Sequence, residues 1–385
     1  MENQARPQPG GPQPLIGVVG LGTMGLGIVQ VFLMAGFRVV ATDASGPVLI
    51  TAPMRLAANL DARIQAGKLT HEARNAALQH LRLVNQIGEL GGAALVIEAI
   101  AEDSDAKRAV FAALEATLAP DAVLATNTSS LSVASVAQGL ARPDRVVGLH
   151  FFNPAPAMKL VELVAHAGSS EAALALARQV ARAAGKTVID APDRPGFVVN
   201  RCARPYYGEA LALLEEGVPA ADIDAAMVAQ GYKIGPFGLI DLIGADIHLA
   251  ATEALFAAMG GHPRYHVFDA LRAQVARGDL GRKAGRGFAT SGITSAAPAN
   301  AAMIVLRIEA VLINEAASLL AEGGTTAAGI DAALRMGMNF PRGPFEALQA
   351  YGAARILGVL GGLAARAPAH LRGRYAPGAA LKEMA

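Results

Sequence analysis

The sequence predicts an α/β amino-terminal domain of the doubly wound Rossmann type, followed by two all-α domains that repeat each other. Three observations support this fold class. Strand and helix patterns alternate through the first half, strand patterns stop after about Pro195, and the helical half repeats its own motifs. A chain of 385 residues is long enough for two or three domains.

Short apolar and β-branched runs in the first half predict strands. They are Leu15–Gly20, Phe37–Asp43, Leu81–Asn85, Ala94–Glu98, Val123–Asn127, Arg145–His150, Lys159–Val164 and Thr187–Asp190. Helical patterns separate several of them, at Gly25–Ala35, Lys107–Leu118 and Ser170–Ala184. This alternation is typical of a mostly parallel sheet that is covered by helices on both faces.

The helical half contains an internal repeat of four short motifs. The first set is Glu209-Ala210, Leu214-Glu215-Glu216-Gly217, Ile223–Met227 and Gly235-Pro236-Phe237. The second set is Glu315-Ala316, Leu320-Ala321-Glu322-Gly323, Ile330–Leu334 and Gly343-Pro344-Phe345. Order and spacing agree to within about one residue, so we predict two copies of one small helical domain.

These patterns predict five segments along the chain. They are a mobile tail at 1–13, a nucleotide-binding domain at 14–193, a first helical domain at 194–290, a linker at 291–300 and a second helical domain at 301–385. The most apolar stretch, Gly238–Gly260, includes Asp241, Asp246 and Glu253. We therefore predict that it is one buried helix of a soluble domain and not a membrane span.

Composition narrows the class of protein. Apolar residues make up 53% and charged residues 17%, with a net charge of +1, which gives no electrostatic reason to expect nucleic acid or a membrane surface as partner. The one cysteine, Cys202, cannot form an internal disulfide, and we interpret it as a small core residue. No metal site and a reducing, cytoplasmic location are expected.

A glycine-rich turn lies between the first predicted strand and the first predicted helix. Its sequence is Gly20-Leu21-Gly22-Thr23-Met24-Gly25, the spacing that lets backbone and helix N-terminus approach a pyrophosphate. Asp43 ends the next predicted strand, where an acid binds the ribose hydroxyls of NAD and repels the 2′-phosphate of NADP. The turn and Asp43 together predict an NAD site.

A histidine and a glutamate fall on adjacent predicted strands. His150 ends one strand, and Glu162 lies within the next. A carboxylate on one imidazole nitrogen fixes the tautomer, so the other nitrogen can take the proton of an alcohol. From spacing alone, a general base and a structural histidine are about equally supported.

Other polar residues follow strand ends or the domain junction. One such segment, Asn127-Thr128-Ser129-Ser130, follows a strand. Apart from a role in ligand binding, its residues would suit a turn or a helix N-cap. Asn200 lies where sheet gives way to helix, and junctions between domains often hold ligands. Glu102 follows the predicted strand Ala94–Glu98, and the alternative to a functional role is an exposed acid in the first turn of a helix.

The chain resembles the L-3-hydroxyacyl-CoA dehydrogenase family over nearly its whole length past Pro14. The matching blocks are Val18–Gly25 (VVGLGTMG), Val96–Glu102 (VIEAIAE), Asn127–Leu131 (NTSSL), Gly148–Glu162 (GLHFFNPAPAMKLVE), Asp193–Arg201 (DRPGFVVNR) and, more faintly, Gly281–Phe288 (GRKAGRGF). The resemblance implies reversible oxidation of a 3-hydroxyacyl-CoA to a 3-ketoacyl-CoA with NAD, as in fatty-acid metabolism.

The resemblance also implies roles for individual residues. His150 is similar to the family's general base and Glu162 to its carboxylate partner, while Ser129 and Asn200 match groups that orient the substrate oxygen. The remaining matches concern the cofactor and coenzyme A: Glu102 faces the cofactor cleft, Lys107 and Asn127 contact NAD, and Arg63 and Lys68 fall where the CoA phosphates are held.

Two copies of the helical domain resemble the dehydrogenase portion of multifunctional fatty-acid oxidation proteins. Short family members carry one copy and dimerise through it, so the second copy here is expected to replace a partner subunit, and both a monomer and a homodimer stay open. Two other functions also stay open. One is an NAD-dependent dehydrogenase of a hydroxy acid without CoA, such as a sugar acid, and the other is a non-catalytic NAD-binding relative. The lysine motif GxxxGxxK of the 3-hydroxyacid and 6-phosphogluconate dehydrogenases is not found.

Overall fold

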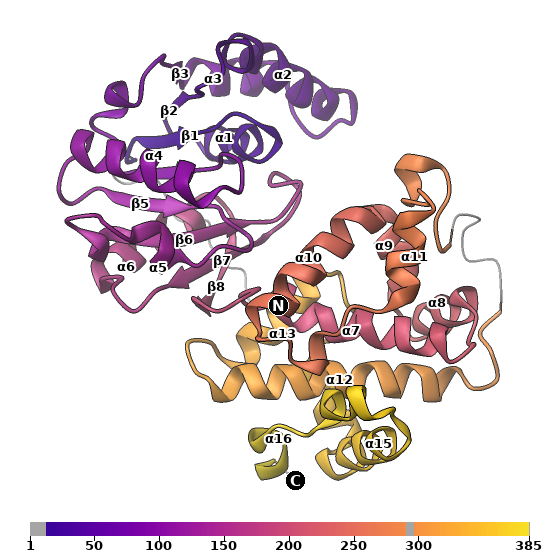
Figure 1. The fold of residues 1–385 in the computed structure, drawn as a ribbon. Coiled ribbons are helices and arrows are strands. Elements are labelled where there is room, and N and C mark those ends of the chain that lie inside the picture. The colour runs from indigo at the N-terminus through magenta and orange to yellow at the C-terminus, as the bar shows by residue number, and fades with distance from the viewer. Residues whose placement is uncertain (1–12, 290–295, 385) are drawn as a thin grey trace. The chain divides into compact units, whose positions relative to one another are not determined.

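The computed structural model describes residues 13–289 and 296–384. Apart from Gln13, the predicted tail lies outside the described residues, and so does the first half of the predicted linker. Backbone contacts divide the chain into two compact units, Met1–Asp193 and Arg194–Ala385 (Figure 1). We call them the sheet unit and the helical unit.

The sheet unit contains eight strands, one at each predicted place. They are β1 (Ile16–Val19), β2 (Val39–Thr42), β3 (Leu81–Leu83), β4 (Leu95–Glu98), β5 (Val123–Thr126), β6 (Val146–Phe151), β7 (Leu160–Ala165) and β8 (Thr187–Pro192). The strand order is β3-β2-β1-β4-β5-β6-β7-β8. All neighbouring pairs are parallel except β6 and β7, which are antiparallel. The predicted doubly wound class is confirmed.

The helices of the sheet unit follow the strands as crossovers. They are α1 (Thr23–Met34), α2 (Gly46–Gln65), α3 (His71–Gln79), α4 (Ser104–Thr117), α5 (Val133–Ala137) and α6 (Glu171–Ala183). The helices α1, α2, α3 and α6 share one hydrophobic cluster with alternate residues of the strands, such as Val147, Leu149 and Val161. Successive strand residues point to opposite faces, so His150 and Glu162 face away from this cluster.

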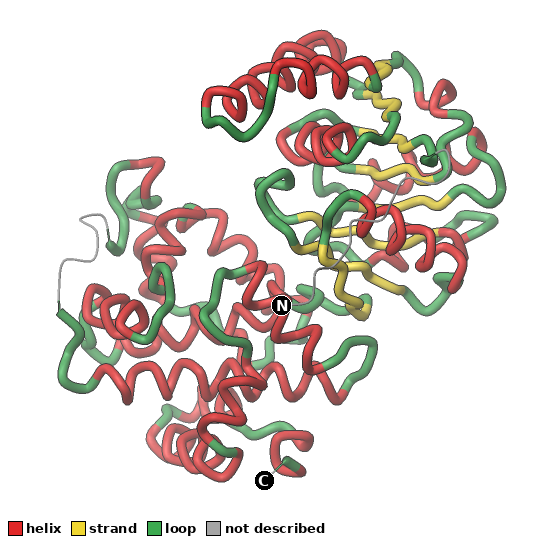
Figure 2. The backbone as a smooth tube through the Cα atoms, turned by 180° about the vertical axis from the view of Figure 1, so that it is seen from behind, coloured by secondary structure: helices red, strands yellow, loops and turns green. Residues whose placement is uncertain are grey.

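The helical unit has no strand among its described residues, as the secondary-structure colours of Figure 2 show. Its helices are α7 (Val199–Glu215), α8 (Ala220–Ala229), α9 (Pro236–Ile243), α10 (Ala245–Ala258), α11 (Asp269–Ala276), α12 (Ala301–Ala321), α13 (Ala327–Gly337), α14 (Pro344–Tyr351), α15 (Ala353–Arg366) and α16 (Ala379–Glu383). Cys202 is buried in α7. No single described helix meets the length and composition of a membrane span, although α14 and α15 would do so as a pair bent by 97°.

The two predicted copies recur in the order of these helices. Asp224 accepts the backbone N–H groups of Phe237 and Gly238 at the start of α9, and Asp331 accepts those of Phe345 and Glu346 at the start of α14. The carboxylate therefore caps the same helix in each copy. Both copies lie within one compact unit.

The prediction of one helix over Gly238–Gly260 is wrong. The chain breaks at Gly244, whose φ of 104° lies in the left-handed region, and the segment forms α9 and α10. Leu242, Ile243 and Ile247 near this corner are exposed. The apolar composition had suggested a continuous buried helix, but the glycine ends α9 after eight residues.

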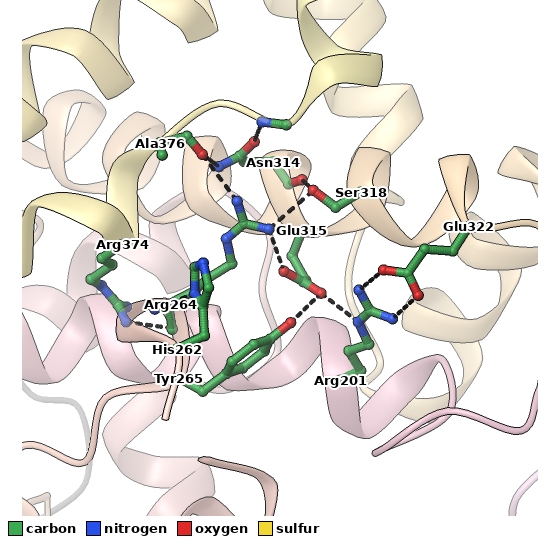
Figure 3. A network of polar contacts seen from close by, with 11 residues as sticks. Arg201, His262, Arg264, Tyr265, Asn314, Glu315, Ser318, Glu322, Arg374 and Ala376 are labelled. Carbon is green, nitrogen blue, oxygen red and sulfur yellow. Dashed lines mark hydrogen bonds and ion pairs between the residues drawn. The ribbon is translucent and has the colours of Figure 1, made fainter. Parts of the chain in front are cut away.

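Buried ion pairs join the two copies with reciprocal partners. Arg201 on α7 binds Glu315 on α12 at 2.5 Å and Glu322, which directly follows that helix, at 2.6 Å (Figure 3). Arg307 on α12 binds Glu209 on α7 at 2.6 Å and the adjoining Glu216 at 2.6 Å. In the second copy, each of these residues follows its counterpart by the same interval of 106 positions.

The segment after each helical set supplies a second arginine and a tyrosine to the same glutamates. Arg264 and Tyr265 donate to Glu315, at 2.9 and 2.6 Å (Figure 3). Arg374 and Tyr375 donate to Glu209, at 2.9 and 3.1 Å. Both glutamates are fully buried, and each accepts hydrogen bonds from two arginines and one tyrosine of the other copy. The interface therefore has the self-complementary form of a twofold contact.

Candidate active site

The antiparallel hairpin of β6 and β7 places a histidine against a glutamate. His150 is directly opposite Glu162 in the register, and its Nδ1 lies 2.6 Å from Oε2 of Glu162. Both side chains are buried, and the glutamate is fully so. Opposed residues of an antiparallel pair point to the same face, so the register itself creates the contact. A carboxylate at Nδ1 favours the tautomer in which Nδ1 carries the proton.

Gly148 allows the neighbouring elements to pack closely on this face of the sheet. A Cβ at Gly148 would lie 2.7 Å from Val164 of β7 and 2.9 Å from Val133 of α5. The glycine therefore lets β7 and α5 pack closely beside β6, two residues before His150. The His150 ring also lies 4.5 Å from the ring of Phe152, measured between centroids. The imidazole is thus held on its edge by Glu162 and on its side by an aromatic ring.

The glycine turn after β1 has the geometry of a phosphate cradle. Gly20 has a φ of 93°, and a Cβ at Gly25 would lie 1.8 Å from the Gly20 carbonyl oxygen, so neither position accepts a side chain. A Cβ at Gly22 would meet nothing within 4 Å. The open side of Gly22 lies at the N-terminus of α1, whose first turn, beginning at Thr23 and Met24, contains no acid. These features fit a pyrophosphate held by backbone N–H groups.

Asp43 follows β2 and is tied to the glycine turn. Its Oδ2 accepts the backbone N–H of Leu21 at 2.7 Å, and its Oδ1 accepts that of Ser45 at 2.8 Å. Arg55 of α2 donates to the Leu21 carbonyl oxygen at 3.0 Å. The carboxylate is therefore fixed in position beside the turn, where a ribose would follow the pyrophosphate.

A buried cluster at the end of β4 includes one acid that the sequence analysis missed. Glu98 is fully buried and binds Lys107 Nζ at 2.7 Å, while the Thr126 hydroxyl donates to it at 2.8 Å. Lys107 also lies 3.2 Å from Glu102, and its side chain is 1% exposed. Lys107 therefore bridges two carboxylates. An acid that ends a buried strand was the available sequence clue to Glu98.

Glu102 organises the loop after β5. Its Oε1 accepts the Thr128 hydroxyl at 2.5 Å, the Ser129 N–H at 3.0 Å and the Ser130 hydroxyl at 2.9 Å. Burial alone would raise the pKa of Glu102, but the hydrogen bond from Thr128 and the charge of Lys107 outweigh it, and the pKa is lowered. Glu102 is thus an anion that anchors Ser129.

The side-chain amide of Asn127 links the end of β5 to the end of β6. Asn127 Oδ1 accepts the backbone N–H of Phe151 at 2.8 Å. The structure therefore brings Asn127, the residue before the Ser129 loop, next to the chain that carries His150. Asp193, which sequence reasoning quoted only as part of a motif, accepts the N–H groups of Val133 and Ala134 at 2.9 and 2.8 Å and so caps α5.

Lys186 is a second residue that sequence reasoning missed. Its Nζ donates to the carbonyl oxygens of Ala155 and Met158, at 2.6 and 2.7 Å, within the connection between β6 and β7. Burial lowers the pKa of Lys186 to about 8. The ammonium group fixes the turn that sets the hairpin register. A lysine preceding an edge strand gave no sequence clue to this contact.

The other predicted site residues belong to elements other than the hairpin. Asn200 is the second residue of α7, in the helical unit, and is partly exposed. Arg63 is in the last turn of α2 and is half-buried, and Lys68 follows that helix and is exposed. The described residues contain no group of three His, Cys, Asp or Glu side chains that could hold a metal ion.

Two family models match most of the chain. The NAD binding domain of 3-hydroxyacyl-CoA dehydrogenase matches residues 15–194, and the C-terminal domain of the same family matches twice, at residues 196–291 and 303–385. The chain belongs to the 3-hydroxyacyl-CoA dehydrogenase family. It is an NAD-dependent oxidoreductase, and an acyl-CoA substrate follows from the family.

Curated relatives of the family are similar over about 71% of the chain. A 3-hydroxyadipyl-CoA dehydrogenase of Escherichia coli K12 is 41% identical over 274 residues, which are 71% of this chain and 58% of that protein. The matched stretch thus spans little more than half of this relative. A 3-hydroxybutyryl-CoA dehydrogenase of Mycobacterium tuberculosis is 39% identical over 279 residues, 71% of this chain and 97% of that protein.

Solved structures of the family match the fold. The crystal structure of a 3-hydroxybutyryl-CoA dehydrogenase from Escherichia coli K12 has a TM-score of 0.89 at 30% identity, covering 96% of this chain and 98% of that one. An (S)-3-hydroxybutyryl-CoA dehydrogenase from Ralstonia eutropha has a TM-score of 0.69 at 36% identity, covering 71% of this chain and 98% of that one. The likeness to the first structure therefore includes both helical copies.

Proposed function

We propose that this protein oxidises the 3-hydroxyl group of an (S)-3-hydroxyacyl-CoA, and reduces the ketone in reverse, with His150 as the general base. The observation that carries the proposal is the buried contact of 2.6 Å between His150 and Glu162. In a family that uses NAD to transfer hydride, a proton acceptor is the group that the protein itself must provide.

The chemistry of the protein's own residues follows from this contact. Glu162 accepts a hydrogen bond from the Nδ1–H group of His150, which fixes the tautomer in which Nε2 takes the proton of the 3-hydroxyl group. Glu162 then stabilises the imidazolium that forms. The nicotinamide of NAD would supply the acceptor for the hydride that leaves C3. In the reverse direction, His150 returns its proton to the ketone oxygen.

Ser129 and Asn200 are proposed to orient the substrate oxygen toward His150. The Ser129 backbone is held by Glu102 at 3.0 Å, which gives this loop a fixed position. Glu102 and Asn127 line the cofactor side in this proposal, and Lys107, whose side chain is buried, holds Glu102 in place from behind. Arg63 and Lys68 are proposed to bind the phosphates of coenzyme A, for which their positive charge is suited.

The function can be tested with two substrates of different classes. We expect oxidation of NADH with acetoacetyl-CoA, and negligible reduction of NAD by L-gulonate, because a sugar acid has no CoA portion for Arg63 and Lys68. Absorbance at the nicotinamide band measures both reactions. Turnover of L-gulonate alone would contradict the proposal, and absence of NADH oxidation with any 3-ketoacyl-CoA would identify a non-catalytic relative.

Asp43 is proposed to select NAD over NADP. Replacing Asp43 with serine removes the charge that binds the ribose hydroxyls and repels a 2′-phosphate. We expect the KM for NADH to rise about ten- to a hundredfold, the usual effect of losing a hydrogen bond to a charged group. The ratio of kcat/KM for NADH to that for NADPH should fall. Asp103→Ser, which alters a helix cap, is the control, and an unchanged cofactor ratio in Asp43→Ser would contradict the assignment.

We also propose that the protein is a monomer in which the second helical copy occupies the place of a partner subunit. The reciprocal contacts of Arg201 with Glu315 and of Arg307 with Glu209 support this, because they have the form of an isologous interface inside one chain. Light scattering should give a mass close to 39.4 kDa at micromolar concentration. An obligate dimer would contradict the proposal.

A further inference from the structure

The first turns of α7 present two polar side chains on one face. Between Gly196 and Leu213, a stretch that the structure describes throughout, only Asn200 and Arg204 are not buried. Residues four apart lie on the same face of a helix, about 6 Å apart along its axis. The guanidinium of Arg204 therefore lies one turn from the amide that the proposed function assigns to the substrate oxygen.

Among the described residues, no carboxylate balances the charge of Arg204. Its Nη1 lies 3.2 Å from Nδ1 of His248 and donates to the Thr252 hydroxyl at 3.1 Å, and the Tyr207 ring lies 5.6 Å from the guanidinium carbon. Burial, and then the charge of Arg204, hold the pKa of His248 well below its usual value, so His248 is neutral. Burial also lowers the pKa of Arg204, and no described acid is paired with it.

One donor of Arg204 is left for a ligand. Its Nη2 donates to none of the described residues and is not closed off from solvent. A guanidinium that is mostly removed from water and lacks a counter-charge is costly to keep. Such a group is suited to a ligand that brings its own negative charge, since arginine binds a carboxylate with charge-assisted hydrogen bonds.

The second helical copy shows that the fold does not require these polar residues. By the alignment of α7 with α12 and of α10 with α15, Asn200 corresponds to Leu306, Arg204 to Ala310, Tyr207 to Ile313, His248 to Ile356 and Thr252 to Leu360. The five residues of the second copy belong to one hydrophobic cluster. The polar set thus occurs only in the copy that carries Asn200, which points to a role in ligand binding.

We propose that Arg204 binds a carboxylate at the far end of the acyl group, so that the preferred substrate is a dicarboxylic 3-hydroxyacyl-CoA. The inference rests on the proposed function, because Asn200 marks the position of the 3-hydroxyl group. In a six-carbon dicarboxylic acyl group the second carboxylate is three carbon–carbon bonds from C3, which is on the scale of one helical turn. The CoA phosphates are separated from C3 by the whole pantetheine arm.

Two substrates of equal chain length test this contact. Initial rates of NAD reduction are measured with 3-hydroxyadipyl-CoA and with 3-hydroxyhexanoyl-CoA, which lacks the second carboxylate. We expect the wild-type protein to favour the dicarboxylic substrate in kcat/KM by about ten- to a hundredfold, the usual effect of a hydrogen bond to a charged group. Arg204→Gln should remove most of this preference, and Arg204→Lys should keep part of it.

The second copy supplies a variant that is designed to fold. Arg204→Ala, His248→Ile and Thr252→Leu, combined, place at these positions the residues that pack at Ala310, Ile356 and Leu360. This triple variant should also lose the preference for the dicarboxylic substrate. Arg335→Gln, which removes an exposed arginine of α13, is the matched control and should keep the wild-type ratio. Inhibition by adipyl-CoA and hexanoyl-CoA, which have no 3-hydroxyl group, measures the same contact without catalysis.

The possible results distinguish a failure of the role given to Arg204 from a failure of the proposed function. If the wild type oxidises both substrates without preference for the dicarboxylic one, the role of Arg204 is wrong and the proposed function stands. The same conclusion follows if Arg204→Gln lowers kcat/KM equally for both substrates, as a contact with the CoA phosphates would. If the wild type oxidises neither substrate nor any other 3-hydroxyacyl-CoA, the proposed function itself fails.

Discussion

Replacing His150 with glutamine is expected to lower turnover by about two to four orders of magnitude, the usual contribution of general acid–base catalysis. Glutamine keeps a polar side chain opposite Glu162 but cannot take up the proton of an alcohol at neutral pH. Steady-state kcat for acetoacetyl-CoA reduction measures the effect. The affinity for NADH, measured by fluorescence titration, should change little, because the glycine turn lies on other elements.

A second buried histidine provides the matched control. His166 lies in the same unit, is 8% exposed, and contacts the Pro143 carbonyl oxygen at 3.1 Å. His166→Gln makes the same chemical change directly after β7, four positions beyond Glu162 and past the opposite end of that strand, so kcat should stay within a few-fold of the wild type. Equal losses in both variants would show that the effect of His150→Gln is structural, and an unchanged kcat in His150→Gln would exclude its role as base.

Removing Glu315 is expected to destabilise the protein by about 3–5 kcal/mol, the typical loss when one partner of a buried ion pair is removed. Glu315→Ala leaves Arg201 and Arg264 buried with fewer acceptors, and the Tyr265 hydroxyl loses its partner. The free energy of unfolding from urea titration measures the loss. Glu209→Ala should cost a similar amount, because Glu209 receives the corresponding donors from the other copy.

An exposed ion pair sets the scale for this comparison. Glu253 of α10 pairs with Arg272 of α11, and the side chains are 43% and 49% exposed. Glu253→Ala should cost less than about 1 kcal/mol, as surface pairs generally do. A loss in Glu315→Ala no greater than that in Glu253→Ala would contradict the role given to the buried network. A large loss for Glu315 and none for Glu209 would show that the reciprocal contacts are not equivalent.

Much of the sheet unit could be predicted because its strands are short apolar runs separated by helical patterns. Each of the eight predicted strands overlaps an observed one to within a few residues. The order of the strands could not be predicted, because it depends on which strands hydrogen-bond and not on their composition. The antiparallel pairing that brings His150 opposite Glu162 likewise depends on which strands hydrogen-bond and not on their composition.

The helical unit shows the same limit. Matched motifs predicted two copies, but the charges that join them were not recognised, although Arg201 and Arg307 stand at corresponding positions. Sequence spacing relates each residue to its own copy, whereas these ion pairs run between copies. Glu98 and Lys186 were missed for a related reason, since their partners lie on other elements.

The antiparallel pairing of β6 with β7 has a consequence for how this chain can vary. Side chains alternate between the faces of a strand, so shifting the pairing by one residue would move Glu162 to the opposite face from His150. The length of the connection at 152–159, which Lys186 holds in place, therefore sets the register in which β7 pairs with β6. An insertion or deletion there that shifted the register by one residue would turn Glu162 away from His150 and turn Val161 and Leu163 out of their hydrophobic cluster. A change in the length of this turn is therefore expected to cost both the contact of Glu162 with His150 and the packing of β7.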